Sequence, residues 1–188
     1  MSLDDMLFLA GFNDEDFSPE VSTSKRFKHW VSLDDEKRCL DCADNHGKIW
    51  KMKEPARPKP PIHPRDRCYI QPMQAIKAGT STLNKTNGAD WTLMHKGLLP
   101  EYYITPDELE VFGWRSGKKV SKFADGKMLF KGIYNNDNYH LPQNPGRIWY
   151  EADINYTGGK RNKQRIVWSN DGLVFVTYDH YKTFMEIK

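Results

Sequence analysis

The feature that most constrains the fold is a strictly alternating stretch near the C-terminus, residues 147–156. Its even positions are apolar or aromatic, whereas its odd positions, tryptophan apart, are polar or charged. A period of two is typical of a strand with one buried face. The following Thr157-Gly158-Gly159-Lys160 predicts a hairpin connection. We therefore expect a half-buried strand that folds back there, with Glu151 opposite Arg165 to within about one residue.

The segments around this hairpin predict an α+β fold, with N-terminal helices packed on a twisted antiparallel sheet. One helix is expected over about residues 88–96. A second should begin at Thr105, because a threonine N-cap, proline at the first helical position and Glu108 at the third form a strong start signal. It should end at Gly113. Strands are expected from about Lys127 onward, including the apolar run 173–176 after a turn at 169–172.

Composition divides the chain near residue 80. Residues 1–80 are expected to form a small irregular segment that carries the cysteines and a proline-rich stretch, loosely ordered at its start except around Trp30. Residues 81–188 are expected to form the α+β domain. With 188 residues, 38% of them hydrophobic, the chain can bury one core and carry an appendage.

Charge and hydropathy bear on partners and location. The net charge of +3 mildly favours a polyanionic partner, and an excess this small is typical of an ordinary solvated surface. The first residues lack the basic and apolar regions of a signal peptide, so we expect cytoplasmic synthesis without one. No apolar run approaches the ~20 residues of a membrane span, so no membrane partner is expected.

The C-terminal strands carry the residue types that metal-free RNA cleavage requires. RNA supplies its own 2′-hydroxyl nucleophile, so the protein must supply a base, an acid and fixed cations. Glu151 can be the base, and His180 the acid, since imidazole titrates near neutrality. Arg161 and Arg165 can grip the phosphate with bidentate forks, and Tyr181 can stack on sugar or base. The alternative is a surface Glu–Arg pair and an ordinary histidine.

A family resemblance covers residues 88–188. The matching segments are Leu99-Pro100-Glu101-Tyr102-Tyr103-Ile104-Thr105, Phe112-Gly113-Trp114, Leu141-Pro142, Gly146-Arg147-Ile148-Trp149, Glu151 to Thr157, Arg161-Asn162, Arg165-Ile166, Asp179-His180-Tyr181 and Thr183-Phe184. They resemble barnase and the related secreted bacterial guanyl-preferring ribonucleases, in the same order and almost without gaps.

The resemblance implies the microbial ribonuclease fold and a metal-independent endoribonuclease. Such an enzyme cleaves single-stranded RNA through a 2′,3′-cyclic phosphate, needs no cofactor, leaves DNA uncut and is held in check by an acidic inhibitor of the barstar kind. It places the general base on Glu151, the general acid on His180, the phosphate-binding arginines on Arg161 and Arg165, and a substrate-contacting tyrosine on Tyr181.

The chain departs from the family pattern at two places. The family's active-site lysine falls on Pro106 and the aspartate that supports it on Gly132, so the pair is missing together. Phosphate binding is then weaker, or Lys131 or another nearby lysine substitutes. In the base-recognition loop, the guanine-reading glutamate falls on Asn138 and the arginine before it on Asp137. We expect looser base preference, from a loop made of Tyr134, Asn135, Asn136, Asp137 and Asn138.

The cysteines form a separate candidate site. Thiolates and imidazole at such spacings can complete a zinc tetrahedron. The segment also resembles the small Cys/His segment of tailed-phage minor head proteins, in which the position of Asp66 is normally cysteine. The alternatives are a site that has lost its metal, or a disulfide between two of the three thiols. The expected ligands of a structural zinc are Cys39, Cys42, His63, Asp66 and Cys68.

Taken together, the sequence predicts an endoribonuclease toxin domain behind a phage-head-like segment, associated with a phage particle or delivered to a target cell. The alternative is a capsid-associated RNA-binding or interaction module whose nuclease half has decayed. The remaining histidines His46, His95 and His140 are expected at the surface, without a role as ligand or catalyst.

Overall fold

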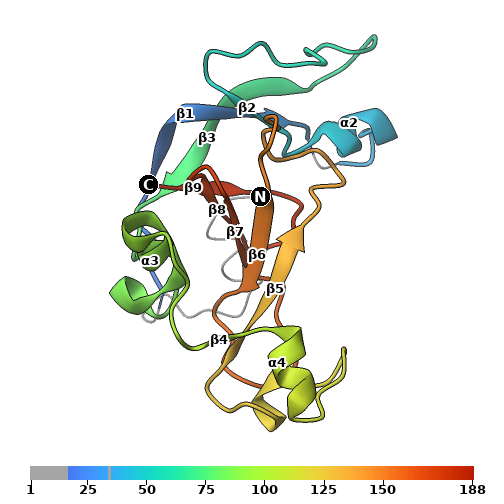
Figure 1. Ribbon diagram of the computed structural model, residues 1–188. Coiled ribbons are helices and arrows are strands. Elements are labelled where there is room, and N and C mark those ends of the chain that lie inside the picture. The colour runs from blue at the N-terminus through green and yellow to red at the C-terminus, as the bar shows by residue number, and fades with distance from the viewer. Residues whose placement is uncertain (1–16, 34) are drawn as a thin grey trace.

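The computed structural model describes residues 17–33 and 35–188, and its architecture is α+β (Figure 1). Nine strands of the described residues form one sheet in the order β2-β1-β3-β9-β8-β7-β6-β5-β4. The β3–β9 and β4–β5 pairs are parallel and the other neighbours are antiparallel. Short helices accompany the sheet, so the expected α+β class with a mostly antiparallel sheet is confirmed.

The C-terminal strands form an antiparallel meander. These are β5 (Met128–Tyr134), β6 (Trp149–Asp153), β7 (Arg165–Ser169), β8 (Val174–Thr177) and β9 (Met185–Ile187). Strand β8 is buried throughout, as the apolar run 173–176 predicts. The meander places β6 and β7 inside the sheet, with neighbouring strands on both sides.

The expected register of the β6–β7 hairpin is wrong by two residues. Asp153 pairs with Arg165, and Glu151 pairs with Val167. The chain leaves the ladder after Asp153 into a wide loop, because Asn155 adopts a left-handed φ of 55° and its side chain donates to Gln164 at 2.7 Å. The expectation that only one face of this strand is buried is also wrong. The face bearing Glu151 and Asp153 is as buried as the opposite face, since the site described below covers it.

Both expected helices are present. Helix α3 (Ala89–Lys96) ends at a left-handed Gly97 and packs on β7 and β8. Helix α4 (Pro106–Val111) contacts β5 and begins with the expected capping box, in which Thr105 and Glu108 bond each other's backbone amides. The remaining short elements are β4 (Tyr103–Ile104), η1 (Lys85–Asn87) and η2 (Val120–Lys122).

The expectation of an irregular N-terminal segment is wrong for much of residues 17–80. This part contains β1 (Val21–Val31), α2 (Leu40–Asn45), β2 (Ile49–Lys51) and β3 (Tyr69–Ile76). Since β3 pairs with β9, its strands extend the C-terminal sheet, as Figure 1 shows for the arch formed by β1, β2 and β3. Strand β1 was not predicted from the sequence because most of its positions are polar and a bulge interrupts its pairing.

The N-terminal strands share a core with the C-terminal meander. Phe27 of β1, Ile49 of β2 and Met73 of β3 are buried in one cluster with side chains from both parts of the chain. The C-terminal members of that cluster are Leu141, Trp149, Val167, Phe175 and Phe184, with Tyr134 and Tyr181 packed against it. The N-terminal strands therefore support the part of the sheet that carries the candidate site.

Two expectations about location depend on different parts of the chain. The expectation about a signal peptide rests on the first residues, which lie outside the described range. Among the described residues, no helix combines the length and the apolar character needed to cross a membrane.

Candidate active site

Glu151 lies at the centre of the candidate site. Its side chain, on β6, is only 5% exposed. One carboxylate oxygen accepts a hydrogen bond from Lys131 Nζ at 2.6 Å, and the other accepts from the Tyr181 hydroxyl. Burial, followed by this contact with Glu151, raises the pKa of Tyr181, so the phenol keeps its proton and remains a donor. The carboxylate is thus fixed between an ammonium and a phenol.

A buried aspartate orients the two arginines. Asp153, two residues beyond Glu151 on the same face of β6, is 1% exposed and accepts from Arg161 Nε and Nη2, both at 2.6 Å. Its Oδ1 also lies 3.0 Å from Arg165 Nε, although that contact lacks hydrogen-bond geometry. The arginine side chains are 28% and 4% exposed respectively. Asp153 therefore anchors both guanidinium groups.

His180 and Tyr181 occupy a tight turn after β8. Both have left-handed backbones, with φ of 62° and 68°, a conformation that non-glycine residues adopt only when their surroundings hold it. Here Asp179 holds the turn by accepting from the backbone amides of Lys182 and Thr183 at 3.1 and 3.0 Å. The turn leaves the His180 imidazole exposed while the Tyr181 ring is partly buried.

The electrostatic surroundings of His180 connect it to the rest of the site. Desolvation lowers its pKa below the ordinary 6.5, the charges of Arg165 and Lys131 lower it further, and Glu151 acts in the opposite direction. The negative charge of Glu151 also favours the charged form of Arg161. The fold thus brings Glu151, Arg161, Arg165 and His180 into one site, as the sequence predicts, although their roles stay predictions.

The loop expected to read the base lies beside Tyr181. Tyr134, at the end of β5, stacks on Tyr181 with ring centroids 5.1 Å apart. The buried side-chain amide of Asn136 donates to Leu141 O and accepts from Leu141 N, both at 3.0 Å, so it shapes the loop. The side chains of Asn135, Asp137 and Asn138 are exposed at its rim.

Two acidic residues were missed as site residues. Asp153 carried a usable signal, because alternation places it on the face of Glu151. Asp179 carried none, because its role depends on the turn geometry.

The expectation that the remaining histidines lie at the surface holds for His95 and is wrong for His140. His140 is 7% exposed because the N-terminal segment covers it. His140 Nε2 lies 3.3 Å from Asp44 O, within α2 of that segment.

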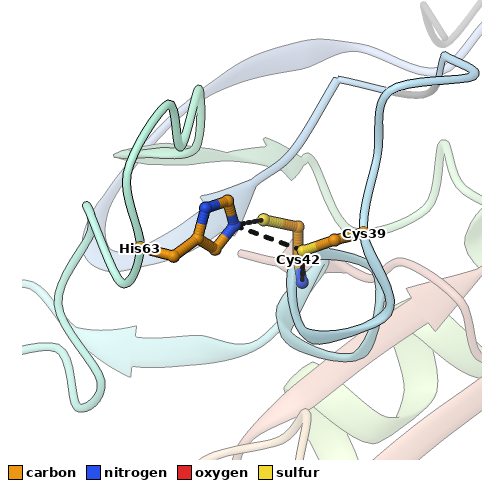
Figure 2. A group of neighbouring side chains, drawn as sticks. All are labelled: Cys39, Cys42 and His63. Atoms are coloured by element: carbon orange, nitrogen blue, oxygen red, sulfur yellow. Dashed lines mark hydrogen bonds between the residues drawn. The ribbon is translucent and has the colours of Figure 1, made fainter.

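The five expected metal ligands also come together, away from Glu151, between α2 and the β2–β3 connection. Cys39, Cys42 and His63 form one group of neighbouring ligand atoms, drawn in Figure 2. Cys42 also belongs to a second group, with Asp66 and Cys68, and within each group the ligand atoms lie within 4.8 Å of one another. All three thiols are free.

Comparison with known proteins agrees with the geometry. The ribonuclease family model matches residues 88–188. The ribonuclease of Heyndrickxia coagulans is 39% identical over 110 residues, which are 57% of this chain and the whole of that protein. The ribonucleases of Bacillus intermedius and Bacillus pumilus are each 39% identical over 110 residues, 67% of their length. The phage-head resemblance of residues 1–80 stays a prediction. The chain belongs to the barnase-type ribonuclease family, and residues 88–188 form its ribonuclease domain.

Proposed function

We propose that this enzyme cleaves single-stranded RNA by transesterification through a 2′,3′-cyclic phosphate, with Glu151 as general base and His180 as general acid. The observation that carries the proposal is the buried Glu151 carboxylate, held by Lys131 and Tyr181 inside a group of cations that also surrounds His180. The alternative of an exposed cross-strand Glu–Arg pair is not supported, because Glu151 is buried and pairs with Val167.

In the first step Glu151 takes the proton of the 2′-hydroxyl. The 2′-oxygen forms a bond to phosphorus as the bond from phosphorus to the 5′-oxygen breaks, and His180 donates its proton to that leaving oxygen. Hydrolysis of the cyclic phosphate reverses the roles, since His180 then takes a proton from water and Glu151 returns one to the 2′-oxygen. Arg161 and Arg165 neutralise charge that grows on the non-bridging oxygens.

Lys131 is the candidate replacement for the family lysine that is missing at Pro106. Its ammonium reaches Glu151 at 2.6 Å and its side chain is 44% exposed, so one end of the ion pair faces solvent. A bound phosphate can therefore share this cation with Glu151. Gly132, where the family has the supporting aspartate, has a φ of 95° within the irregular β5–β6 register, consistent with a different local geometry.

Substrate recognition is proposed to combine stacking with loose base reading. The stacked Tyr134 and Tyr181 rings offer an aromatic surface beside the reacting groups. The exposed Asp137 side chain can accept from the guanine amine, while Asn138 lacks the charge of the family glutamate. We expect cleavage after guanine to be favoured less strictly than in the family, and mapping the product ends of a defined RNA measures this preference.

The decisive experiment compares single-residue variants on total RNA. Glu151→Ala and His180→Ala are each expected to lower the cleavage rate by ~10²–10⁴-fold, the usual contribution of general acid–base catalysis. The matched controls Glu101→Gln and His95→Ala change exposed residues of the same types and are expected to cleave normally. Near-wild-type cleavage by either site variant would overturn the mechanism.

Two controls in the same assay test the reaction class. Cleavage is expected to continue in excess chelator, because the proposed chemistry passes through no metal ion. DNA of the same sequence is expected to stay intact because it lacks the 2′-hydroxyl nucleophile.

The departures at Pro106, Gly132 and Asn138 favour the decayed RNA-binding module as the second candidate. Binding of RNA without cleavage by the wild-type chain would support that module.

A further inference from the structure

The cysteine cluster has no part in the proposed chemistry, and it is built from segments far apart in the sequence. Cys39 is the N-cap of α2, and its sulfur accepts from Cys42 N at 3.4 Å. The connection between β2 and β3 folds over α2 and brings His63 to both thiols and Cys68 to Cys42. Figure 2 shows the His63 imidazole directed at both sulfurs.

The spacing of His63 from the sulfurs of Cys39 and Cys42 fits a tetrahedral ion. His63 Nε2 lies 3.2 Å from the sulfurs of both Cys39 and Cys42. In a tetrahedral zinc site with ordinary bond lengths, a nitrogen and a sulfur ligand are roughly 3.6 Å apart. An ion at the centre would therefore move these atoms by only a few tenths of an ångström.

The second nitrogen of His63 supports the same interpretation. Nδ1 lies 2.9 Å from the carbonyl oxygen of Pro64, which can only accept, so Nδ1 carries the proton and donates. Nε2 then presents its lone pair to two sulfurs. Histidines that ligate metals are oriented in this way, with the far nitrogen donating to a carbonyl or carboxylate.

Asp66 lies beside the thiols, with its Oδ1 3.6 Å from Cys42 Sγ, and it also holds the loop. Its Oδ2 accepts from Ile62 N and its Oδ1 from Cys68 N, both at 2.7 Å, so the carboxylate closes the loop that presents Cys68. The Cys68 sulfur lies next to Cys42. We propose that Cys39, Cys42, His63 and Cys68 bind one Zn²⁺ in a closed structural site, with Asp66 holding the loop.

Direct contacts also link the segment that carries the proposed zinc site to the candidate active site. Asp44 O, within α2, lies 3.3 Å from His140 Nε2, and Ile49 N, at the start of β2, donates to His140 O at 2.8 Å. At Gly47 a Cβ atom would collide with the carbonyl oxygen of Lys182, so the segment packs closely against the turn that carries His180. Metal binding at Cys39 and Cys42 is therefore expected to steady both the base-reading loop and this turn.

The primary test measures the metal in the full chain, purified under reducing conditions, by inductively coupled plasma and native mass spectrometry. We expect one zinc per chain, and Co²⁺ in its place should give the visible bands of a tetrahedral thiolate site. Cys42→Ser and His63→Ala are expected to lose the metal, whereas His95→Ala is the matched control and retains it. Metal-free wild-type protein that also fails to take up Zn²⁺ or Co²⁺ overturns the site, as does a disulfide in the freshly purified chain.

The assignment of the fourth ligand is tested with Asp66→Asn and Cys68→Ser. Asp66→Asn is expected to keep the cobalt spectrum with weaker binding. Cys68→Ser is expected to weaken the thiolate-to-cobalt bands, because two of the three thiolates remain. The reverse result would make Asp66 a ligand and overturn our assignment.

A second measurement, the effect of zinc removal on stability and RNA cleavage, depends on the proposed function. Zinc removal is expected to lower the melting temperature, to raise KM for RNA through the base-reading loop and to lower kcat through the turn that carries His180. A lower melting temperature with KM and kcat both unchanged would contradict the support of the loops.

Discussion

At the scale of single residues, the largest departure from the family pattern is the missing active-site lysine, for which Lys131 is the candidate replacement. Its ammonium contacts Glu151 and faces solvent, so it can also meet a phosphate. Lys131→Ala is expected to lower kcat/KM by roughly 10–100-fold, since a charge-assisted hydrogen bond contributes about 1.5–3 kcal/mol. Lys127→Ala, which removes an ammonium that donates to the carbonyl oxygen of Glu101 at 2.8 Å, is the control. Equal rates for the two variants would exclude Lys131 as the replacement.

The proposed acid has a lowered pKa, and this fixes the shape of the pH profile. His180 must be protonated to donate, and desolvation together with Arg165 and Lys131 holds its pKa below 6.5. The kcat/KM value, which reports the free enzyme, should therefore fall as pH rises through a value below 6.5. Lys131→Ala removes one of those positive charges and should move this limb to higher pH. A basic limb that persists unchanged in His180→Ala would contradict the assignment.

The sequence predicted the reacting groups better than their supports. Glu151, Arg161, Arg165 and His180 could be found because their chemistry is distinctive and the order of the strands brings them together. The anchoring by Asp153 and Asp179 depends on a two-residue register shift and on consecutive left-handed residues. Alternation marks the face of Asp153, but the register that pairs it with Arg165 is set by contacts across the sheet, and the left-handed turn is set by the contacts of Asp179 within it.

At the scale of elements, the same division between local and distant causes holds. The α4 start was predictable because Thr105 and Glu108 cap it within four residues of chain. Strand β1 was not, because its mostly polar sequence is held by pairing with residues of β2 and β3 that lie 20 or more positions away in the chain. A strand of this kind is specified by what it packs against rather than by its own alternation.

The burial of β1 has a consequence for acid stability. Burial, and the nearby charge of His46, lower the pKa of His29 from 6.5 to about 4. Between these pH values the unfolded chain binds a proton that the folded chain does not, so stability falls as pH drops, by about 2–3 kcal/mol. His29→Gln should lose this part of the pH dependence. Urea unfolding at pH 7 and 4.5 measures it, with His95→Ala as control, and an identical pH dependence in wild type and His29→Gln contradicts it.

At the scale of the whole molecule, the active face presents cations over buried acids. The carboxylates of Glu151 and Asp153 are 5% and 1% exposed, whereas Lys131 and Arg161 are 44% and 28% exposed. Lys163, His180 and Lys182 are exposed beside them. The chain's net charge of +3 gives little hint of this separation. Such a surface attracts RNA phosphates, and it equally suits any partner that presents carboxylates in their place.

We propose that a small acidic protein inhibits the enzyme by covering this face. A cell whose own RNA meets the active enzyme needs such an inhibitor, and opposite charges on the two surfaces would speed their association; the barnase–barstar pair is the known example of this arrangement, from which the idea is taken. Co-expression with small acidic proteins encoded beside the gene is expected to rescue growth of cells that make the wild-type chain. The Glu151→Ala chain, inactive but with the same exposed cations, should need no rescue yet bind the inhibitor, more weakly as salt rises. Healthy cells producing the active wild-type enzyme without any such partner would contradict this prediction.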